Sequence, residues 1–183
     1  MSEHTLTNAE LAILSLISEK PRHGYEIEGV IEERGMRDWT EVAFSSIYFI
    51  LNGLVKKGLA VSTLQPAAGR GPSKKVFHST DKGHKALHEG ILQALVAEDR
   101  SGQSFLLALA CLPLLTRSEV ETAFNQRMEF LKSKIEELSR HPTLMIPGMP
   151  LHVQAMFEYS INQIQAELDW SKKFLISYLS GEK

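Results

Sequence analysis

The 183-residue chain has a single cysteine, Cys111, so it can form no disulfide within itself. Proteins of reducing compartments rarely contain disulfides, and a reducing compartment is therefore the expected one. The longest strongly apolar run, residues 105–115, contains Pro113 and is too short to cross a bilayer. The N-terminal residues lack the basic and then apolar segments of a signal peptide. We therefore expect a soluble, cytoplasmic protein with no membrane partner.

The sequence also lacks the residue groupings that mark an enzyme or a metalloprotein. It has no nucleophile–base–acid grouping, no glycine-rich phosphate loop and no cluster of metal ligands. His84 and His88 stand four residues apart, but a structural zinc site needs four ligands, and we expect both imidazoles to face solvent. Cys111 lies in an apolar run, where a thiol is typically an inert core residue. The sequence predicts no catalytic residue, no metal and no cofactor.

The net charge of −2 gives no overall basic excess, but the charges are unevenly distributed. Residues 1–44 carry four Lys/Arg and nine Asp/Glu, whereas residues 45–90 carry seven and two. Residues 91–183 carry nine and eleven. A local positive excess is what phosphate binding requires, although a solvated basic surface without a partner has the same composition.

The first 58 residues predict three short helices. Thr7 and Glu10 form a capping box, and Pro21 ends the helix that begins there. A second helix is expected from about residue 23 to residue 34, with Tyr25 among its apolar residues, and Gly35 ends it. The third is expected over residues 42–57. Three such helices with brief connections form a helix-turn-helix unit.

The helix predicted over residues 42–57 has two different faces. Its apolar residues recur at spacings of three and four, and its other side carries small polar groups, an aromatic ring and an amine. The apolar face comprises Ile47, Ile50, Leu51 and Leu54, and the opposite side carries Ser45, Phe49, Asn52 and Lys56. Such a helix can lie in a DNA major groove, but the same periodicity is typical of any amphipathic surface helix.

After this helix the pattern changes to short β-prone runs, residues 59–64 and 75–79, joined by a turn-rich basic loop over 65–74, and the predicted wing contacts lie within 65–75. A hairpin that follows a recognition helix is a wing. Thr80 then caps another helix, from residue 82 to about residue 99. The predicted fold is mainly α with a small β-hairpin, and its N-terminal part, residues 1–100, is a winged helix-turn-helix DNA-binding domain.

Residues 101–183 are expected to form a helical dimerisation domain. A short helix over 105–112 is followed by a long helix that a second capping box opens at Thr116, a stiff loop over 142–150 and a last helix over 151–179. Two long helices with broad apolar faces need a further surface to pack against. A two-fold dimer supplies it and matches palindromic DNA sites, while an intramolecular bundle is the alternative.

Three segments, taken in order, resemble the PadR family of bacterial transcriptional regulators. Residues 11–31, which contain Gly24-Tyr25-Glu26-Ile27, look like the family's first two helices, and residues 46–59, with Tyr48, look like its recognition helix. Residues 69–75, followed by Thr80-Asp81-Lys82-Gly83, look like its wing and the entry to its fourth helix. The C-terminal half more loosely resembles the longer, virulence-activator-like branch.

This resemblance implies a DNA-binding repressor, less often an activator, that a small ligand or a stress signal controls. Phe77 stands where the family often has Tyr, a change that should alter little. Ser45-Ser46 stands where a Gly-Thr type of pair is common, and this departure leaves the base preference open.

The predicted DNA contacts come from the 42–57 helix and the wing. Asn52 can bond adenine in two places, and the Tyr48 hydroxyl can reach a phosphate. Phe49 either packs on a thymine methyl or belongs to the core. Arg70 can enter the minor groove, unless the loop is merely solvated. The full set is Ser45, Ser46, Tyr48, Phe49, Asn52, Lys56, Arg70, Ser73, Lys74 and Lys75.

Five aromatic residues of the C-terminal half either line a pocket for a small aromatic effector or are plain core and interface: Phe105, Phe157, Trp170, Phe174 and Tyr178. The expected mechanism is a homodimer that places two recognition helices in successive major grooves of a pseudo-palindromic operator, about 34–36 Å apart. A winged-helix module that binds protein instead of DNA is the alternative.

Overall fold

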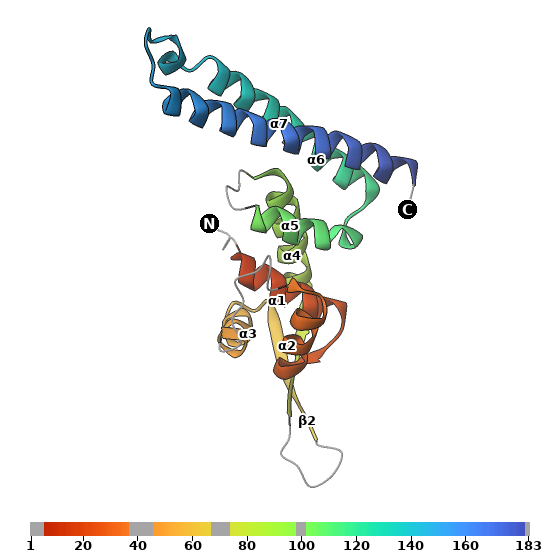
Figure 1. Ribbon diagram of the computed structural model, residues 1–183. Coiled ribbons are helices and arrows are strands. Elements are labelled where there is room, and N and C mark those ends of the chain that lie inside the picture. The colour runs from red at the N-terminus through yellow and green to blue at the C-terminus, as the bar shows by residue number, and fades with distance from the viewer. Residues whose placement is uncertain (1–5, 37–45, 67–73, 98–101, 182–183) are drawn as a thin grey trace. The chain divides into compact units, whose positions relative to one another are not determined.

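The computed structural model describes residues 6–36, 46–66, 74–97 and 102–181. The chain divides into two compact units, Met1–Leu115 and Thr116–Lys183 (Figure 1). The first unit contains α1 (Asn8–Glu19), β1 (Arg22–His23), α2 (Gly24–Glu33), α3 (Ile47–Lys56), β2 (Ala60–Gln65), β3 (Lys74–Ser79), α4 (Asp81–Val96), α5 (Gln103–Ala110) and η3 (Leu112–Leu114). The second contains α6 (Arg117–Ser139), η4 (Pro142–Met145) and α7 (Leu151–Ser180).

Helix α1 forms the centre of the first unit. The Glu10 N–H donates to the Thr7 hydroxyl and the Thr7 N–H donates to the Glu10 carboxylate, so the predicted capping box is present. Every residue from Leu11 to Ile17 is buried, because α3, α4, α5 and β3 all contact this helix. An apolar helix that packs on all sides supplies the core on which the shorter elements depend.

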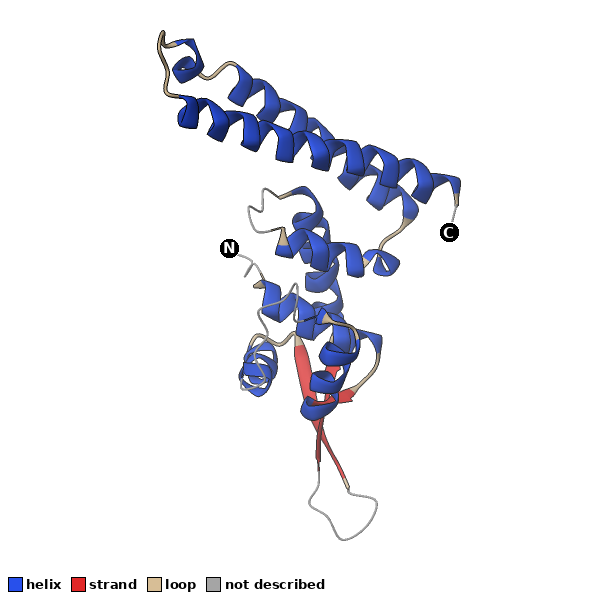
Figure 2. Ribbon diagram, in the orientation of Figure 1, coloured by secondary structure: helices blue, strands red, loops and turns tan. Residues whose placement is uncertain are grey.

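Three strands form one sheet in the part of the chain that the structure describes (Figure 2). Strand β3 is central and pairs antiparallel with β2 from Ser79↔Ala60 to Lys74↔Gln65. It also pairs with β1 through Arg22↔Phe77 and His23↔Val76. The predicted hairpin is confirmed, but the prediction missed β1, because two residues between a proline and a helix show no strand periodicity. Strand β1 attaches the start of α2 to the wing.

Helices α4 and α5 complete the first unit. The Gly83 N–H donates to the Thr80 hydroxyl at 3.0 Å, which caps α4. Gly83 lies so close to the end of α3 that a Cβ there would be 2.0 Å from the Leu59 carbonyl oxygen. Helix α5 packs against α4 and α1, and the first compact unit therefore ends at Leu115. This is later than the boundary after residue 100 that the sequence pattern suggested.

The second unit is an antiparallel hairpin of α6 and α7 (Figure 1). The capping box of Thr116 and Glu119 opens α6 as predicted. Residues 142–150, predicted as a loop, contain the short 3-10 helix η4. Arg127 of α6 is 4% exposed, and its Nε donates to Glu167 Oε1 of α7 at 2.7 Å. This pair lies between the helices and fixes which turns face each other, because the Arg127 charge is buried and Glu167, which is partly exposed, compensates it.

Large apolar side chains remain exposed on α7. Leu151 and Ile176 are 80% and 69% exposed, and Met156 and Tyr159 are more than half exposed. The apolar face of α7 is therefore wider than the surface that α6 covers. Several large apolar side chains exposed on one helix are candidates for an interaction surface.

Candidate nucleic-acid interface

Helix α3 has the two faces that the sequence predicts. Its apolar residues pack into the core, and Leu51 and Leu54 are 0% exposed. Phe49, by contrast, is 81% exposed, and Asn52 and Lys56 are exposed beside it. The alternative that Phe49 belongs to the core of this unit is therefore wrong. An aromatic ring held in water on a well-packed helix is a candidate contact for a partner.

The structure describes the predicted recognition helix from Ser46 onward. Ser46 is half-buried at its start. Ser45 and residues 42–44, the first part of the predicted helix, lie outside the described residues. The helix itself runs from Ile47 to Lys56, one residue short of its predicted end.

Tyr48 packs against the first residue of α2. A Cβ at Gly24 would lie 2.5 Å from Cζ of the Tyr48 ring, so Gly24 lets α2 and α3 approach closely. Tyr48 is nevertheless 48% exposed. One side of its ring therefore holds two helices together, and the rest of the side chain remains open to a ligand.

Tyr25 joins the start of α2 to the wing. Its ring stacks on His23, with 5.6 Å between centroids, and Lys74 Nζ lies 4.9 Å from the Tyr25 centroid and 3.4 Å from its hydroxyl. His23 Nδ1 lies 2.9 Å from the Lys75 carbonyl oxygen, which can only accept, so this nitrogen donates. Tyr25, one of the predicted apolar residues of this helix, is 52% exposed, whereas Ile27 and Ile31 are buried.

The wing projects into solvent. In β2, Ala60 is buried and the residues from Val61 to Gln65 are exposed. In β3, Lys74 and Lys75 are exposed, whereas the next two residues anchor the strand in the core. Arg70 and Ser73 lie outside the described residues. The structure thus brings Lys74 together with Tyr25 and His23, and leaves Lys75 accessible beside them.

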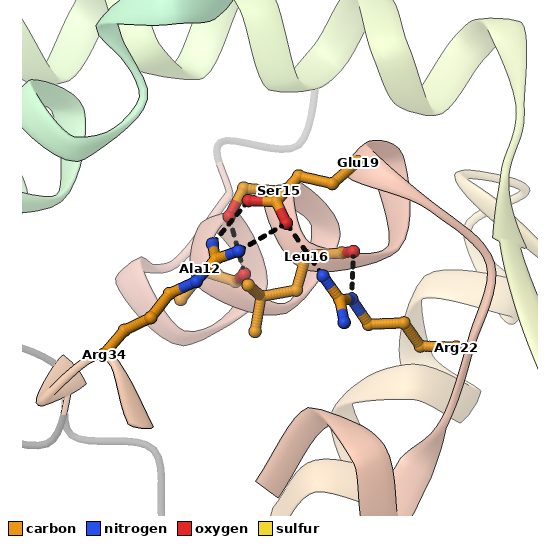
Figure 3. Close-up of polar contacts among 6 residues, drawn as sticks. All are labelled: Ala12, Ser15, Leu16, Glu19, Arg22 and Arg34. Carbon is orange, nitrogen blue, oxygen red and sulfur yellow. Dashed lines mark hydrogen bonds and ion pairs between the residues drawn. The ribbon is translucent and has the colours of Figure 1, made fainter. Parts of the chain in front are cut away.

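A charged cluster fastens α1, β1 and the end of α2 to one another (Figure 3). Arg34 donates two hydrogen bonds to the Glu19 carboxylate, at 2.6 and 2.9 Å, and Arg22 donates to the same carboxylate at 2.8 Å. The buried Arg22 also donates from Nε to the Leu16 carbonyl oxygen at 2.9 Å. The hydrogen bonds from Arg34, and then those from Arg22, lower the pKa of Glu19 against the opposing effect of burial. This cluster fixes the frame from which α3 and the wing project.

The five aromatic residues predicted as an effector site come from both units. Phe105 belongs to the first unit and is 7% exposed, and the other four belong to α7. Phe174 stacks with Trp170 and with Tyr178, at 5.1 and 5.8 Å. Phe157 instead lies 5.0 Å from the ring of His141, about 25 Å along α7 from Phe174 at 1.5 Å per residue. A single small-molecule pocket cannot include both ends of this set.

A cavity of about 440 Å³ lies beside the wing, lined by Pro21, His23, Glu26, Thr63, Leu64, Gln65, Pro66, Val76 and His78. None of the five predicted aromatic residues lines it. Within the described ranges, no three His, Cys, Asp or Glu side chains are grouped so that they could hold a metal ion. No helix among the same residues is long and apolar enough to span a membrane.

Cys111 is a core residue of the first unit, as expected. It is 6% exposed, and burial raises the pKa of its thiol to about 11. A thiol of this kind stays protonated and unreactive at neutral pH.

The winged architecture agrees with the sequence comparison. Residues 13–89, from the middle of α1 to the second half of α4, match the family described as "Transcriptional regulator PadR-like family". Residues 13–89 are therefore a PadR-like domain. The matched segment contains α3 and both strands of the wing.

Relatives extend the similarity beyond this domain. The chain is 25% identical over 143 residues to the negative transcriptional regulator PadR of Bacillus subtilis (strain 168), covering 76% of each chain. Among solved structures, Bacillus subtilis PadR in complex with operator DNA is 20% identical, with a TM-score of 0.45, over 92% of this chain and 98% of that one. The smu.1604c protein of Streptococcus mutans UA159 is 23% identical, with a TM-score of 0.43, over 91% and 98%.

Proposed function

We propose that this protein is a dimeric, sequence-specific repressor whose α3 enters the DNA major groove. The observation that carries the proposal is the 81% exposure of Phe49 on a helix whose opposite face is buried. The exposed ring contributes little to the stability of the fold, and a bound partner would remove it from water. The positive excess of residues 45–90 favours DNA over protein as this partner, and the PadR-like domain of residues 13–89 supports the same choice.

The proposal assigns a chemical role to each contact residue. Asn52 reads adenine, Phe49 packs on a thymine methyl, and Lys56 binds a phosphate. On the wing, Lys74 and Lys75 hold the backbone. Ser45, Ser46 and Ser73 bond base edges or phosphates, Arg70 enters the minor groove, and the hydroxyls of Tyr48 and Tyr25 reach phosphates.

In this proposal the two compact units have different functions. The winged unit binds DNA, and the α6–α7 hairpin pairs with that of a second copy through the apolar side chains that α6 leaves exposed on α7. The dimer sets its two α3 helices about 34–36 Å apart, the spacing of successive major grooves. A small aromatic compound or a stress signal changes this spacing and releases the operator. The protein acts in the cytoplasm by binding, without catalysis.

The test is binding to a fluorescent duplex from the gene's own upstream region, beside a scrambled duplex, at several salt concentrations. We expect preferential binding of the upstream duplex and a steep loss of affinity as salt rises. Replacing both Lys74 and Lys75 by Met should reduce the slope of log K against log salt by about 1.8. The matched control replaces Lys132 and Lys134 of α6, which removes the same charge from the other unit and should leave the slope unchanged.

Two outcomes count against the proposal. Equal affinity for both duplexes would remove sequence-specific recognition. Absence of binding at low salt would support the alternative, a winged-helix module that binds protein, and the exposed face of α7 would then be the surface on which to look for the partner. p-Coumaric acid, which a Bacillus subtilis PadR complex contains, is the first compound to add once operator binding is established.

A further inference from the structure

Two adjacent lysines at the end of α3 point in different directions. Lys56 is exposed on the same side as Phe49 and Asn52. The next residue, Lys57, turns toward α1, where its Nζ donates to Glu10 Oε1 at 2.6 Å. The side chains of this pair are 30% and 13% exposed, for Lys57 and Glu10 respectively. The helical periodicity places Lys56 on the side of Phe49 and Asn52, but it does not reveal that Lys57 pairs with Glu10.

Glu10 is also held by a contact that does not involve Lys57. Its other carboxylate oxygen accepts the Thr7 N–H at 3.1 Å in the capping box of α1. An ion pair between mobile surface side chains contributes little, partly because ordering them costs conformational entropy. Here one partner is already ordered by the cap and is largely shielded from water. The contact therefore fastens α3 to the helix at the centre of the unit.

The carbonyl groups at this end of α3 are fastened from the other side by α4. Lys82 Nζ donates to the Lys57 carbonyl oxygen at 3.0 Å. The Thr80 hydroxyl donates to the Gly58 carbonyl oxygen at 2.8 Å, and the Thr80 N–H donates to the Leu59 carbonyl oxygen at 3.1 Å. The first of these carbonyl groups belongs to the C-cap of α3 and the other two to the residues that follow it, so the donors attach the end of α3 to the start of α4. Cationic groups are also favourable at a helix C-terminus.

We propose that Lys57 and Lys82 are positioning residues that set the angle of α3, whereas Lys56 is the phosphate contact. This inference rests on the proposed function. A helix of ten residues is about 15 Å long, so a tilt of about 5° at one end displaces the other by about 1.3 Å. A displacement of that size breaks hydrogen bonds to base edges. It has little effect on attraction between charges and phosphates, which depends weakly on exact position.

The experiment uses a charge-neutral double variant of the full-length protein, Glu10→Gln with Lys57→Met. Gln still serves in a capping box, and the net charge is unchanged. At a temperature where all variants are fully folded, we expect the Kd for the upstream duplex to rise about three- to tenfold. The Kd for the scrambled duplex should stay within about twofold, and the salt slope should not change. The single variant Lys57→Arg, in which Glu10 is kept and can still form the ion pair, should have the wild-type Kd.

Lys56→Met is the matched control. Since it removes a phosphate contact, it should weaken binding to both duplexes and lower the salt slope by about 0.9. Lys82→Met should weaken binding to the upstream duplex with a slope closer to wild type than that of Lys56→Met. Amide hydrogen exchange at residues 54–59 should be faster in the double variant than in wild type, with the centre of α1 unchanged.

Three results would overturn the inference. An unchanged Kd of the double variant for the upstream duplex would make the anchoring irrelevant to recognition. An equal loss on both duplexes would point to general damage. Unchanged hydrogen exchange would show that the contacts do not hold α3, whatever the DNA results. If wild type itself fails to prefer the upstream duplex, it is the proposed function that fails, and the exchange measurement still reports on the anchoring.

Discussion

Replacing Phe49 by Ala should separate recognition from stability. The ring is 81% exposed, so its removal deletes little apolar surface that folding buries. Exposed substitutions typically change the free energy of unfolding by no more than about 0.5 kcal/mol, and Ala is the better helix former. The matched variant is Leu51→Ala, two residues further along α3 and 0% exposed. Its expected loss is about 2–5 kcal/mol, or about 4–20 °C in Tm.

The effect on DNA binding should be the reverse. Fully burying a Phe side chain is worth about 1.5–3 kcal/mol, and half-burial against a base about 1 kcal/mol. Phe49→Ala should therefore raise the Kd for the operator about fivefold. Anisotropy titrations measure this value, and thermal unfolding measures stability on the same samples.

A modified duplex tests the chemistry of the contact directly. If Phe49 packs on a thymine methyl, replacing that thymine by deoxyuracil should weaken wild-type binding and leave Phe49→Ala unaffected. The reasoning would be refuted if Phe49→Ala lowered Tm as Leu51→Ala does, because the ring would then be buried in the free protein. It would equally be refuted by an unchanged operator Kd.

Three further variants test α3 and the frame around it. Because Arg34 lowers the pKa of Glu19 below its ordinary 4.5, their pair stabilises the fold above that pH and ceases to do so as the carboxylate is protonated. Arg34→Met should therefore lower the stability at pH 7 by about 1 kcal/mol or less, since both groups are partly exposed. The difference between the two proteins should shrink as the pH falls below 4.5, and a difference that does not depend on pH would contradict this. Gly83→Ala should cost about 1–3 kcal/mol, because its Cβ would meet the Leu59 carbonyl oxygen. Gly53→Ala, with open space around its Cβ inside α3, should instead stabilise by about 0.5–1 kcal/mol, and equal effects at the two glycines would be inconsistent with this packing.

The sequence predicts the helices of the first unit well because their signals are local. A capping box, a proline or a glycine acts within a few residues, and apolar periodicity assigns a face to each helix. The burial of Leu51 and the exposure of Asn52 follow from that periodicity. Strand β1 could not be predicted in this way, because its two residues become a strand only by pairing with β3, more than fifty residues later.

The candidate site was harder to predict where roles depend on tertiary contacts. Tyr25 is an apolar residue by type, and its stack on His23 and the position of Lys74 over its ring depend on the pairing of β1 with β3. The role of Lys57 depends on Glu10, in a helix far away in the sequence. The aromatic residues of α7 were grouped by type, but a straight helix keeps residues many turns apart from sharing one pocket.

Because Cys111 is buried, its reactivity can report on local opening of the first unit. The chain has a single thiol, which is enclosed beside α1 and stays protonated at neutral pH. A thiol-reactive dye can therefore attach only when this part of the molecule opens, and the labelling rate measures the population of open states in native buffer. Labelling in the presence and absence of operator DNA would give the stabilisation conferred by binding, without denaturant and without any engineered site.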